Sequence, residues 1–211
     1  MQVAIVLYPG VTALDAVGPY EVLRLMPDTE LRFVGHSPGP LMTDAGILTL
    51  GVTHTFAETP APDLVLVPGS ERGTQAAMAD PVLRQWLVDT HRTARWTTSV
   101  CSGALILGAA GLLEGLDATT HWLVQDALPH FGARSCPAER VVHQGRIVTA
   151  AGVSAGIDLA LWLAGEIHGQ EVAEAIQLTI EYDPRPPFDA GHPSKASESV
   201  TAMARAGFME R

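Results

Sequence analysis

The chain has 211 residues, of which 47% are hydrophobic and 17% charged, a composition that excludes an intrinsically disordered protein and suits one domain with a substantial core. A formal net charge of −10, from 13 Lys and Arg against 23 Asp and Glu, argues against sequence-independent binding of nucleic acid. The N-terminus lacks the features of a signal peptide, no segment reaches the roughly 20 apolar residues of a membrane span, and the two cysteines in unrelated contexts indicate a reduced, cytoplasmic protein.

Short apolar runs alternate with helical patterns through the first half of the chain. Residues 3–8 (VAIVLY) form a continuous apolar run closed by Pro9-Gly10, which is typical of a strand buried on both faces of a sheet. Residues 41–56 alternate weakly and predict a hairpin or a small insertion at the sheet edge. Further strands are expected at 31–36, 63–67 and 96–100, with helices at 15–26, 73–78 and 81–92.

The second half continues this alternation and then changes character. Residues 183–193 (DPRPPFDAGHP) are too rich in proline for a helix or an inner strand and should run extended over the surface. We therefore predict one α/β domain over residues 1–211, with a mostly parallel sheet and helices on both faces. The helices expected here cover 102–113, 121–131, 157–167, 171–182 and 195–208, with short strands at 117–120 and in two stretches of 141–150.

Cys101 lies in the turn between the strand at 96–100 and the helix that follows, in the phrase WTTSVCSGALIL. The first N–H groups of that helix should point at the thiol, lower its pKa and hold negative charge on a substrate. Gly103 leaves room for the close approach of another backbone or of a ligand. Because ligands bind at the carboxyl ends of parallel strands, Cys101 is the predicted nucleophile, although a buried structural cysteine has the same local pattern.

Three further places could complete a site around this cysteine. Asp15 begins the helix after the first strand and can face the same crevice, or it can serve only as a favourable charge at the helix N-terminus. His121 could orient the thiol, or it could be an ordinary half-buried histidine. The turn of Pro68, Gly69 and Ser70 follows a buried strand, and the N–H groups of Gly69 and Ser70 could bind an oxyanion.

Other motifs carry less weight. Residues 152–156 match G-x-S-x-G, but no strand is expected after Ser154 to supply the acid and the histidine of a serine hydrolase. Cys136 lies in no strand-to-helix turn and is interpreted as incidental. The histidines show no metal-ligand spacing, and no phosphate-binding glycine motif follows a strand, so we expect no metal, nucleotide or other cofactor.

Several phrases together resemble the ThiJ/PfpI superfamily, which includes the Parkinson-disease protein and the class I glutamine-amidotransferase-like fold. Within it, the chain is most similar to the isocyanide (isonitrile) hydratase branch, because its first helix carries Asp rather than Glu. The resemblance implies a flavodoxin-like three-layer sandwich and a homodimer. The phrases, which occur in this order over nearly the whole chain, are LDAVGPYEV, LVLVPGSERGTQ, TTSVCSGALILGAAGLLEG, ATTHW, AAGVSAGIDLAL and EYDPRPPFDAGHP.

The resemblance also implies a chemistry. Cys101 would attack the terminal carbon of an isocyanide and Asp15 would move protons, so that water adds through a thioimidate to give an N-substituted formamide. Burial beside the thiol should raise the pKa of Asp15. Ser102 keeps the hydroxyl of the threonine found in that branch, and Ser70 replaces the second glycine of its usual Pro-Gly-Gly turn. Val153 is expected to line an apolar pocket for the substituent.

Three other functions stay open. They are a glyoxalase or deglycase that acts on small carbonyls, a ligand-sensing domain related to those of AraC-type regulators, and a redox sensor that uses oxidation of Cys101. The glyoxalase branches carry Glu at the first helix, and a regulator would need a separate DNA-binding partner. The expected partner is a small molecule, with no nucleic acid and no membrane.

Overall fold

The computed structural model describes residues 1–209 as two compact units, the first ending at Ile180 and the second beginning at Glu181. The first unit holds all the strands of the described chain. The second contains the proline-rich segment 183–193, which forms neither helix nor strand, and one helix, α7 (Glu198–Met209). None of the described helices is long and apolar enough to cross a membrane.

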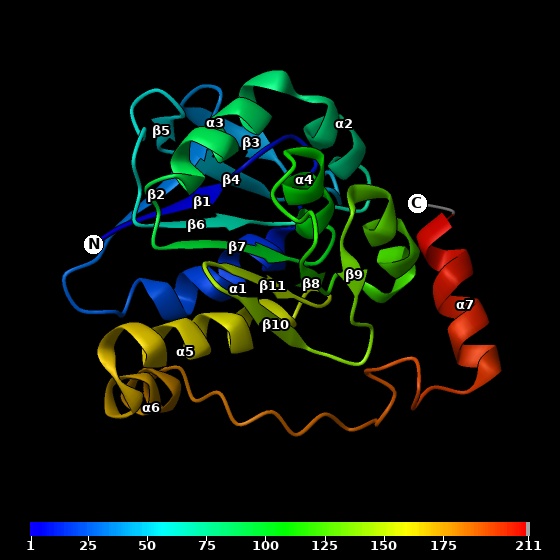
Figure 1. The fold of residues 1–211 in the computed structure, drawn as a ribbon. Coiled ribbons are helices and arrows are strands. Elements are labelled where there is room, and N and C mark those ends of the chain that lie inside the picture. Colours follow the sequence, from blue (N-terminus) through cyan, green and yellow to red (C-terminus); the bar gives the residue numbers. More distant parts are fainter. Residues whose placement is uncertain (210–211) are drawn as a thin grey trace. The chain divides into compact units, whose positions relative to one another are not determined.

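A seven-stranded sheet forms the centre of the first unit (Figure 1). Its strands lie in the order β10-β11-β7-β6-β1-β2-β5, and every neighbouring pair is parallel except β10 with β11. The inner strands consist of apolar and β-branched residues that are buried on both faces, as a sheet between two helical layers requires. The bounds are Gln2–Val6 (β1), Glu30–Gly35 (β2), His54–Thr55 (β5), Leu64–Val67 (β6), Trp96–Val100 (β7), Val141–Gln144 (β10) and Ile147–Ala150 (β11).

Helices cover both faces of this sheet (Figure 1). On one face α1 packs against α5, and α5 packs against α6, while α2, α3 and α4 pack together on the other. The arrangement confirms the predicted α/β fold and the three layers that the resemblance implied. The bounds are Ala13–Leu23 (α1), Thr74–Ala79 (α2), Pro81–His91 (α3), Gly103–Ala109 (α4), Ala155–His168 (α5) and Gln170–Thr179 (α6).

Two elements of the first unit refine the prediction. The weakly alternating segment forms a hairpin of β3 (Gly39–Met42) and β4 (Thr49–Val52), which is a separate two-stranded sheet. The helix after Cys101 ends at Ala109, earlier than predicted, because Gly111 adopts a left-handed conformation with φ 77°.

The segment after α4 differs more strongly from the prediction. The strand predicted at 117–120 is only β8 (Asp117–Ala118), which lies outside the main sheet and pairs with β9 (Arg134–Ser135), a strand that was not predicted. Between them, the expected helix is a 3-10 helix, η1 (Trp122–Phe131), with a kink at Val124. Two-residue strands carry too little periodicity to be recognised from sequence.

The N-terminal halves of α1 and α5 meet through two glycines. A Cβ added to Gly18 would lie 3.1 Å from Ile157 Cγ1, and one added to Gly156 would lie 2.9 Å from Pro19 Cγ. Residues that are unfavourable inside a helix therefore allow the two helices to pack closely. Because these contacts lie within about two helical turns of each helix start, the N-terminal ends of α1 and α5 are neighbours.

The strand order reverses between β1 and β6. The chain leaves β1 toward β2 and leaves β6 toward β7, on opposite sides, so the carboxyl ends of β1 and β6 mark a topological switch point, the place where open α/β sheets bind ligands. Thr12 N–H donates to Gly69 O at 3.0 Å across this point. Since β7 adjoins β6, the residue that follows β7, Cys101, lies at the same edge.

Candidate active site

Cys101 occupies a strained turn between β7 and α4. Its φ is 58°, in the left-handed region, which costs a non-glycine residue about 1–2 kcal/mol. The surroundings hold this conformation, because Cys101 N–H donates to the carbonyls of Ala150 and Ala151 at 3.2 and 2.9 Å. On the other side, Thr120 Oγ1 donates to the Cys101 carbonyl at 2.8 Å. The turn thus presents a nearly buried thiol at the carboxyl edge of the sheet.

Two glycines let this turn pack against the neighbouring strand end. A Cβ on Gly103 would lie 2.1 Å from the Val67 carbonyl oxygen, so α4 can start at this place only with glycine. A Cβ on Gly69 would lie 2.5 Å from Ser102 N and 2.9 Å from Cys101 Cβ. The space that Gly103 provides is therefore filled by backbone, and the turn after β6 lies directly against the cysteine turn.

The pKa of the Cys101 thiol is raised above its ordinary value, which corrects the lowering predicted from the helix N-terminus. Burial is the main cause, and the negative charge of Asp15 adds to it. The N–H groups of Val153 and Ser102 donate to the sulfur and oppose the shift, but they do not outweigh the loss of water. The thiol therefore loses its proton readily only when that proton passes to a neighbour.

Asp15 is that neighbour, and it is fully buried in the first turn of α1. Burial raises its pKa to about 7, Gly69 N–H and the Cys101 thiol lower it, and the Asp44 carboxylate raises it further. Asp15 Oδ2 accepts from Gly69 N–H at 2.9 Å, whereas Oδ1 has no partner of ordinary hydrogen-bond geometry among the described residues. Because adjacent buried negative charges repel, the thiol and the carboxyl together keep at least one proton near neutral pH.

The two amides expected to bind an oxyanion are already engaged inside the protein. Gly69 N–H donates to Asp15, and Ser70 N–H donates to Ser102 Oγ at 2.9 Å. The close approach of α4 brings the Ser102 hydroxyl onto the turn, and the oxyanion role of Gly69 and Ser70 stays a prediction. The amides that face negative charge at the thiol are instead those of Ser102 and Val153.

Val153 contributes a backbone N–H rather than only an apolar side chain. Its φ is 27°, which a β-branched residue rarely adopts. Its side chain is half-buried against the core. Two strained residues, Cys101 and Val153, thus meet at the sulfur, and strain of this kind concentrates at functional sites.

His121 supports this second strained turn. A Cβ added to Gly152 would lie 2.5 Å from His121 Cδ2, so the imidazole lies against the residue just before Val153. His121 Nδ1 accepts from Leu123 N–H at 3.4 Å, and burial lowers the pKa of the ring. Because the pKa of the ring is lowered, the imidazole is mostly neutral at neutral pH, and it packs against the turn that holds Val153.

Two buried hydroxyls near the site were missed by sequence reasoning. Tyr8 Oη donates to the Pro68 carbonyl at 2.9 Å. Thr74 Oγ1 donates to the Ser70 carbonyl at 2.9 Å and lies 2.7 Å from Ser102 Oγ. The only available signal was position, because Tyr8 follows the first strand and Thr74 opens the helix after β6, both at the carboxyl edge of the sheet.

Ser154 and Cys136, the other two side chains considered as nucleophiles, lie outside the cysteine turn. Ser154 is exposed at the start of α5, where its hydroxyl accepts from Arg140 Nη2 at 3.3 Å. Cys136 is half-buried just after β9, and its Sγ lies 3.8 Å from the Arg134 carbonyl. Within residues 1–209, no group of three or more His, Cys, Asp and Glu side chains is arranged to hold a metal ion.

Replacing Ser154 by Ala is expected to change kcat/KM by less than about twofold and the free energy of unfolding by less than about 0.5 kcal/mol, because the hydroxyl is on the surface. Steady-state kinetics and thermal unfolding of the variant measure both. A variant that folds but has lost its turnover would restore the serine-hydrolase interpretation.

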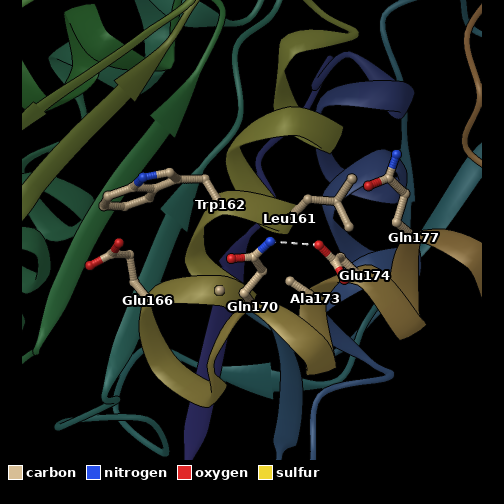
Figure 2. Close-up of a pocket in the computed structure, with 8 residues that line it drawn as sticks. Leu161, Trp162, Glu166, Gln170, Ala173, Glu174 and Gln177 are labelled. Carbon is tan, nitrogen blue, oxygen red and sulfur yellow. Dashed lines mark hydrogen bonds between the residues drawn. The ribbon is translucent and has the colours of Figure 1, made fainter.

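A separate pocket of about 300 Å³ lies between α5 and α6. Figure 2 shows Trp162 and Glu166 of α5 on one side of it, and Gln170 bonded to Glu174 on α6 at 2.7 Å. The first of its lining residues, Leu161, is eight positions beyond Val153, or about 12 Å along the helix axis. This pocket is therefore distinct from the place where the thiol lies.

Comparison with known proteins gives four results. Residues 1–166 match the DJ-1/PfpI family. The chain is 42% identical over 205 residues to an isonitrile hydratase from Pseudomonas putida, which covers 97% of this chain and 89% of that protein. The structure of a ThiJ/PfpI family protein from Pseudomonas syringae superposes with a TM-score of 0.93 at 41% identity, over 99% of this chain and 87% of that one. A shorter match, 36% identical over 94 residues, covers 44% of this chain and 28% of the HTH-type transcriptional regulator CdhR of Pseudomonas aeruginosa.

Proposed function

Because the chain belongs to the DJ-1/PfpI family, we propose that it is an isocyanide hydratase, which adds water to R–N≡C and releases an N-substituted formamide. The similarity to the isonitrile hydratase of Pseudomonas putida, over nearly the whole of both chains, supports this reaction class. The single observation that carries the proposal is the buried contact between the Cys101 thiol and the Asp15 carboxyl.

This contact suits an isocyanide because its terminal carbon must receive both a nucleophile and a proton. A thiol and a carboxyl that share one proton can supply both, since the proton can reside on Asp15 while Cys101 attacks. The N–H groups of Val153 and Ser102 stabilise the sulfur while it is negatively charged. Because Asp15 and Cys101 are both buried, bulk water has little access to them, which favours this transfer over reaction with solvent.

In the first step, the Cys101 sulfur forms a bond to the terminal carbon of the isocyanide, and Asp15 delivers the shared proton to that carbon. The N≡C bond becomes the N=C bond of a thioimidate, R–N=CH–S–Cys, and the carboxyl is left as the carboxylate. No oxidant or reductant takes part.

In the second step, Asp15 removes a proton from a water molecule that attacks the thioimidate carbon, and this proton passes to the nitrogen. The tetrahedral intermediate R–NH–CH(OH)–S–Cys then breaks its C–S bond. The remaining hydroxyl proton returns to the thiol and carboxyl pair, and R–NH–CHO leaves. Substrate and water are thereby fully accounted for, and the protein returns to its initial state.

The reaction should slow in acid with a midpoint near pH 7. The pKa of Asp15 is raised to about 7, so below this pH the thiol and the carboxyl each hold a proton and no base is left to ionise the sulfur. We expect kcat/KM to rise about tenfold per pH unit below the midpoint and to level off above it. A pH profile in overlapping buffers measures this, and a constant rate between pH 5 and pH 8 would contradict the assigned role of Asp15.

The direct test is to incubate the protein with cyclohexyl isocyanide and to follow the formyl proton of the product by NMR. Methylglyoxal is the matched second substrate, since a glyoxalase or deglycase would convert it instead. Formamide that appears in proportion to enzyme concentration supports the proposal. Turnover of methylglyoxal without any formamide would reject it in favour of carbonyl chemistry.

One observation favours a second candidate. The partial match to a transcriptional regulator covers less than half of this chain and leaves a ligand-sensing role as the alternative. A protein that binds an isocyanide or carbonyl compound, measured by calorimetry, but never turns it over would support that role.

We further propose that the protein works as a cytoplasmic homodimer on a small molecule, and that residues 1–211 form one functional domain. The net charge of −10 supports the absence of a nucleic-acid partner. Light scattering measures the oligomeric state, and a monomer at working concentration would reject the dimer.

A further inference from the structure

The peptide that joins Pro68 to Gly69 is held from both sides. Its N–H, on Gly69, donates to Asp15 Oδ2 at 2.9 Å, and its C=O, on Pro68, accepts from Tyr8 Oη at 2.9 Å. In a trans peptide the N–H and the C=O point in opposite directions within one plane. The two hydrogen bonds therefore fix the orientation of the same rigid group.

We propose that Tyr8 is a positioning residue for the reaction, because its hydroxyl, acting through the Pro68–Gly69 peptide, aims the Gly69 N–H at the Asp15 carboxyl that moves the proton. The role of Asp15 in this inference rests on the proposed function. The arrangement of hydrogen bonds does not depend on the substrate, so it can be tested separately.

Tyr8 is well placed for this role. It follows β1 at the carboxyl edge of the sheet and is only 5% exposed. Its hydroxyl bonds to the Pro68 carbonyl and interacts with the side chain of Thr74. Burial raises the pKa of Tyr8 well above its usual value, so the phenol keeps its proton and remains a donor throughout the working pH range.

The hydrogen bond from Tyr8 has two effects on Asp15. It prevents rotation of the peptide, and it polarises the amide, since a bond accepted at C=O strengthens the N–H as a donor. The Gly69 N–H stabilises the carboxylate form of Asp15 and lowers its pKa against the effect of burial. Loss of the Tyr8 hydroxyl should therefore move the pKa of Asp15 upward.

Other hydrogen bonds hold the rest of the same turn. Ser102 Oγ accepts from Ser70 N–H, and Thr74 Oγ1 donates to the Ser70 carbonyl. These bonds fix the peptides that follow Gly69, so the turn should survive when Tyr8 no longer holds the peptide before it. Because the turn is expected to survive, an effect of the Tyr8 substitution on the pKa of Asp15 can be measured without a general loss of structure.

The charged and titratable groups that face Asp15 come from three other elements. They are Cys101 before α4, Asp44 in the turn between β3 and β4, and Tyr8 after β1. Asp44 Oδ2 accepts from Thr12 Oγ1 at 2.5 Å and is held independently of Pro68. Its effect on Asp15 should therefore stay constant when Tyr8 changes.

Tyr8→Phe removes one oxygen and tests the proposal. We expect the acid midpoint of kcat/KM to move upward by about 0.5–1 pH unit, which corresponds to a loss of about two- to sixfold at pH 7 that largely recovers at pH 9. The same upward shift is expected in the pH dependence of Cys101 alkylation by iodoacetamide, read at the Cys101 peptide by mass spectrometry. Alkylation requires no isocyanide and so separates this inference from the proposed function.

Tyr20→Phe is the matched control, because Tyr20 lies on the same helix as Asp15 but stacks on Phe33 with ring centroids 5.4 Å apart. It should leave both midpoints unchanged. Site-specific 3-fluorotyrosine at position 8, a stronger donor of the same shape, should move both midpoints downward, and it replaces the phenylalanine variant if that variant does not fold.

The results of these experiments test the positioning role of Tyr8 and the proposed function separately. If both midpoints stay unchanged in Tyr8→Phe, or in the fluorotyrosine protein when the former does not fold, the positioning role is wrong. If the wild type makes no formamide but the alkylation midpoint shifts with Tyr8, the proposed function fails while Tyr8 still positions Asp15.

Discussion

Replacing Cys101 by Ala is expected to lower the hydration of cyclohexyl isocyanide by at least about 10⁴-fold, to the level of the uncatalysed reaction. The proposed path has no intermediate without the carbon–sulfur bond, and the other cysteine of the sequence, Cys136, follows β9 of a separate two-stranded sheet. The rate of formamide release, measured at equal protein concentration, tests this expectation.

The loss should come from chemistry rather than from unfolding. The backbone hydrogen bonds of Cys101 to Ala150, Ala151 and Thr120 do not involve the sulfur, so they remain in the variant. Only the interactions of the sulfur itself with the Val153 and Ser102 N–H groups and with Asp15 are lost. Exchange of a buried sulfur for hydrogen removes little packing, so the free energy of unfolding should change by no more than about 1–2 kcal/mol. Circular dichroism and thermal unfolding of the variant provide this measurement.

Cys136→Ala is the matched control and should retain wild-type turnover. In the wild type, rapid acid quench during turnover should trap a species that is heavier by one isocyanide, on the peptide that contains Cys101. If Cys101→Ala still turns over, or if the mass appears on Cys136, the covalent path through Cys101 is wrong.

Local features of the sequence were enough to predict the cysteine turn. The run Trp96–Val100 is β-branched and continuous, and Gly103 follows the cysteine, so strand, turn and helix could all be assigned before the structure. The structure adds the reason for the glycine, which is the carbonyl of Val67. A short-range pattern of this kind is visible in sequence because all its parts lie within a few residues.

The hydrogen bonds of the site could not be predicted in the same way. Gly69 N–H was expected to face a substrate, but it faces Asp15, because the turn after β6 and the start of α1 meet across the sheet reversal. Val153 acts through a backbone amide, for which no side chain gives a signal. Both features depend on how distant loops are brought together, and so they need the three-dimensional fold.

The sequence also could not predict whether the pKa of the Cys101 thiol is raised or lowered. A helix N-terminus predicts a lowered pKa for Cys101, and the expected N–H groups are present at the sulfur. Burial and the carboxyl of Asp15 outweigh them, and neither the depth of Cys101 nor its contact with Asp15 is encoded near residue 101. The raised pKa values of both groups support the proposal that the thiol and the carboxyl react as a pair rather than through a free thiolate.

Replacing Asp15 by Asn should therefore remove activity and at the same time stabilise the protein at alkaline pH. An amide cannot accept and return a proton, and loss of a general acid–base typically costs about 10²- to 10⁴-fold in rate. The Asn side chain keeps an oxygen for Gly69 N–H, so the turn after β6 should keep its position. Steady-state kinetics should show the loss in kcat across the whole pH range, without the acid limb of the wild type.

The stability gain follows from the direction of the Asp15 pKa. The folded protein holds this proton up to about pH 7, whereas an unfolded chain releases it near the ordinary value of 3.8, so the native state loses stability as pH rises between these values. An Asn side chain does not ionise, so the variant does not lose stability in this way as pH rises. Asp15→Asn and wild type should differ little near pH 4, and the variant should become more stable as pH rises to 7, by no more than about 4 kcal/mol.

Thermal or urea unfolding of both proteins at several pH values tests this, with Asp44→Asn as the matched control, because Asp44 is a neighbouring carboxyl that is only partly buried. A difference between wild type and Asp15→Asn that stays constant from pH 4 to pH 9 would mean that Asp15 is already ionised at no cost when the protein folds. It would then be a helix charge rather than the proton carrier of the site, and the paired chemistry with Cys101 would have to be abandoned.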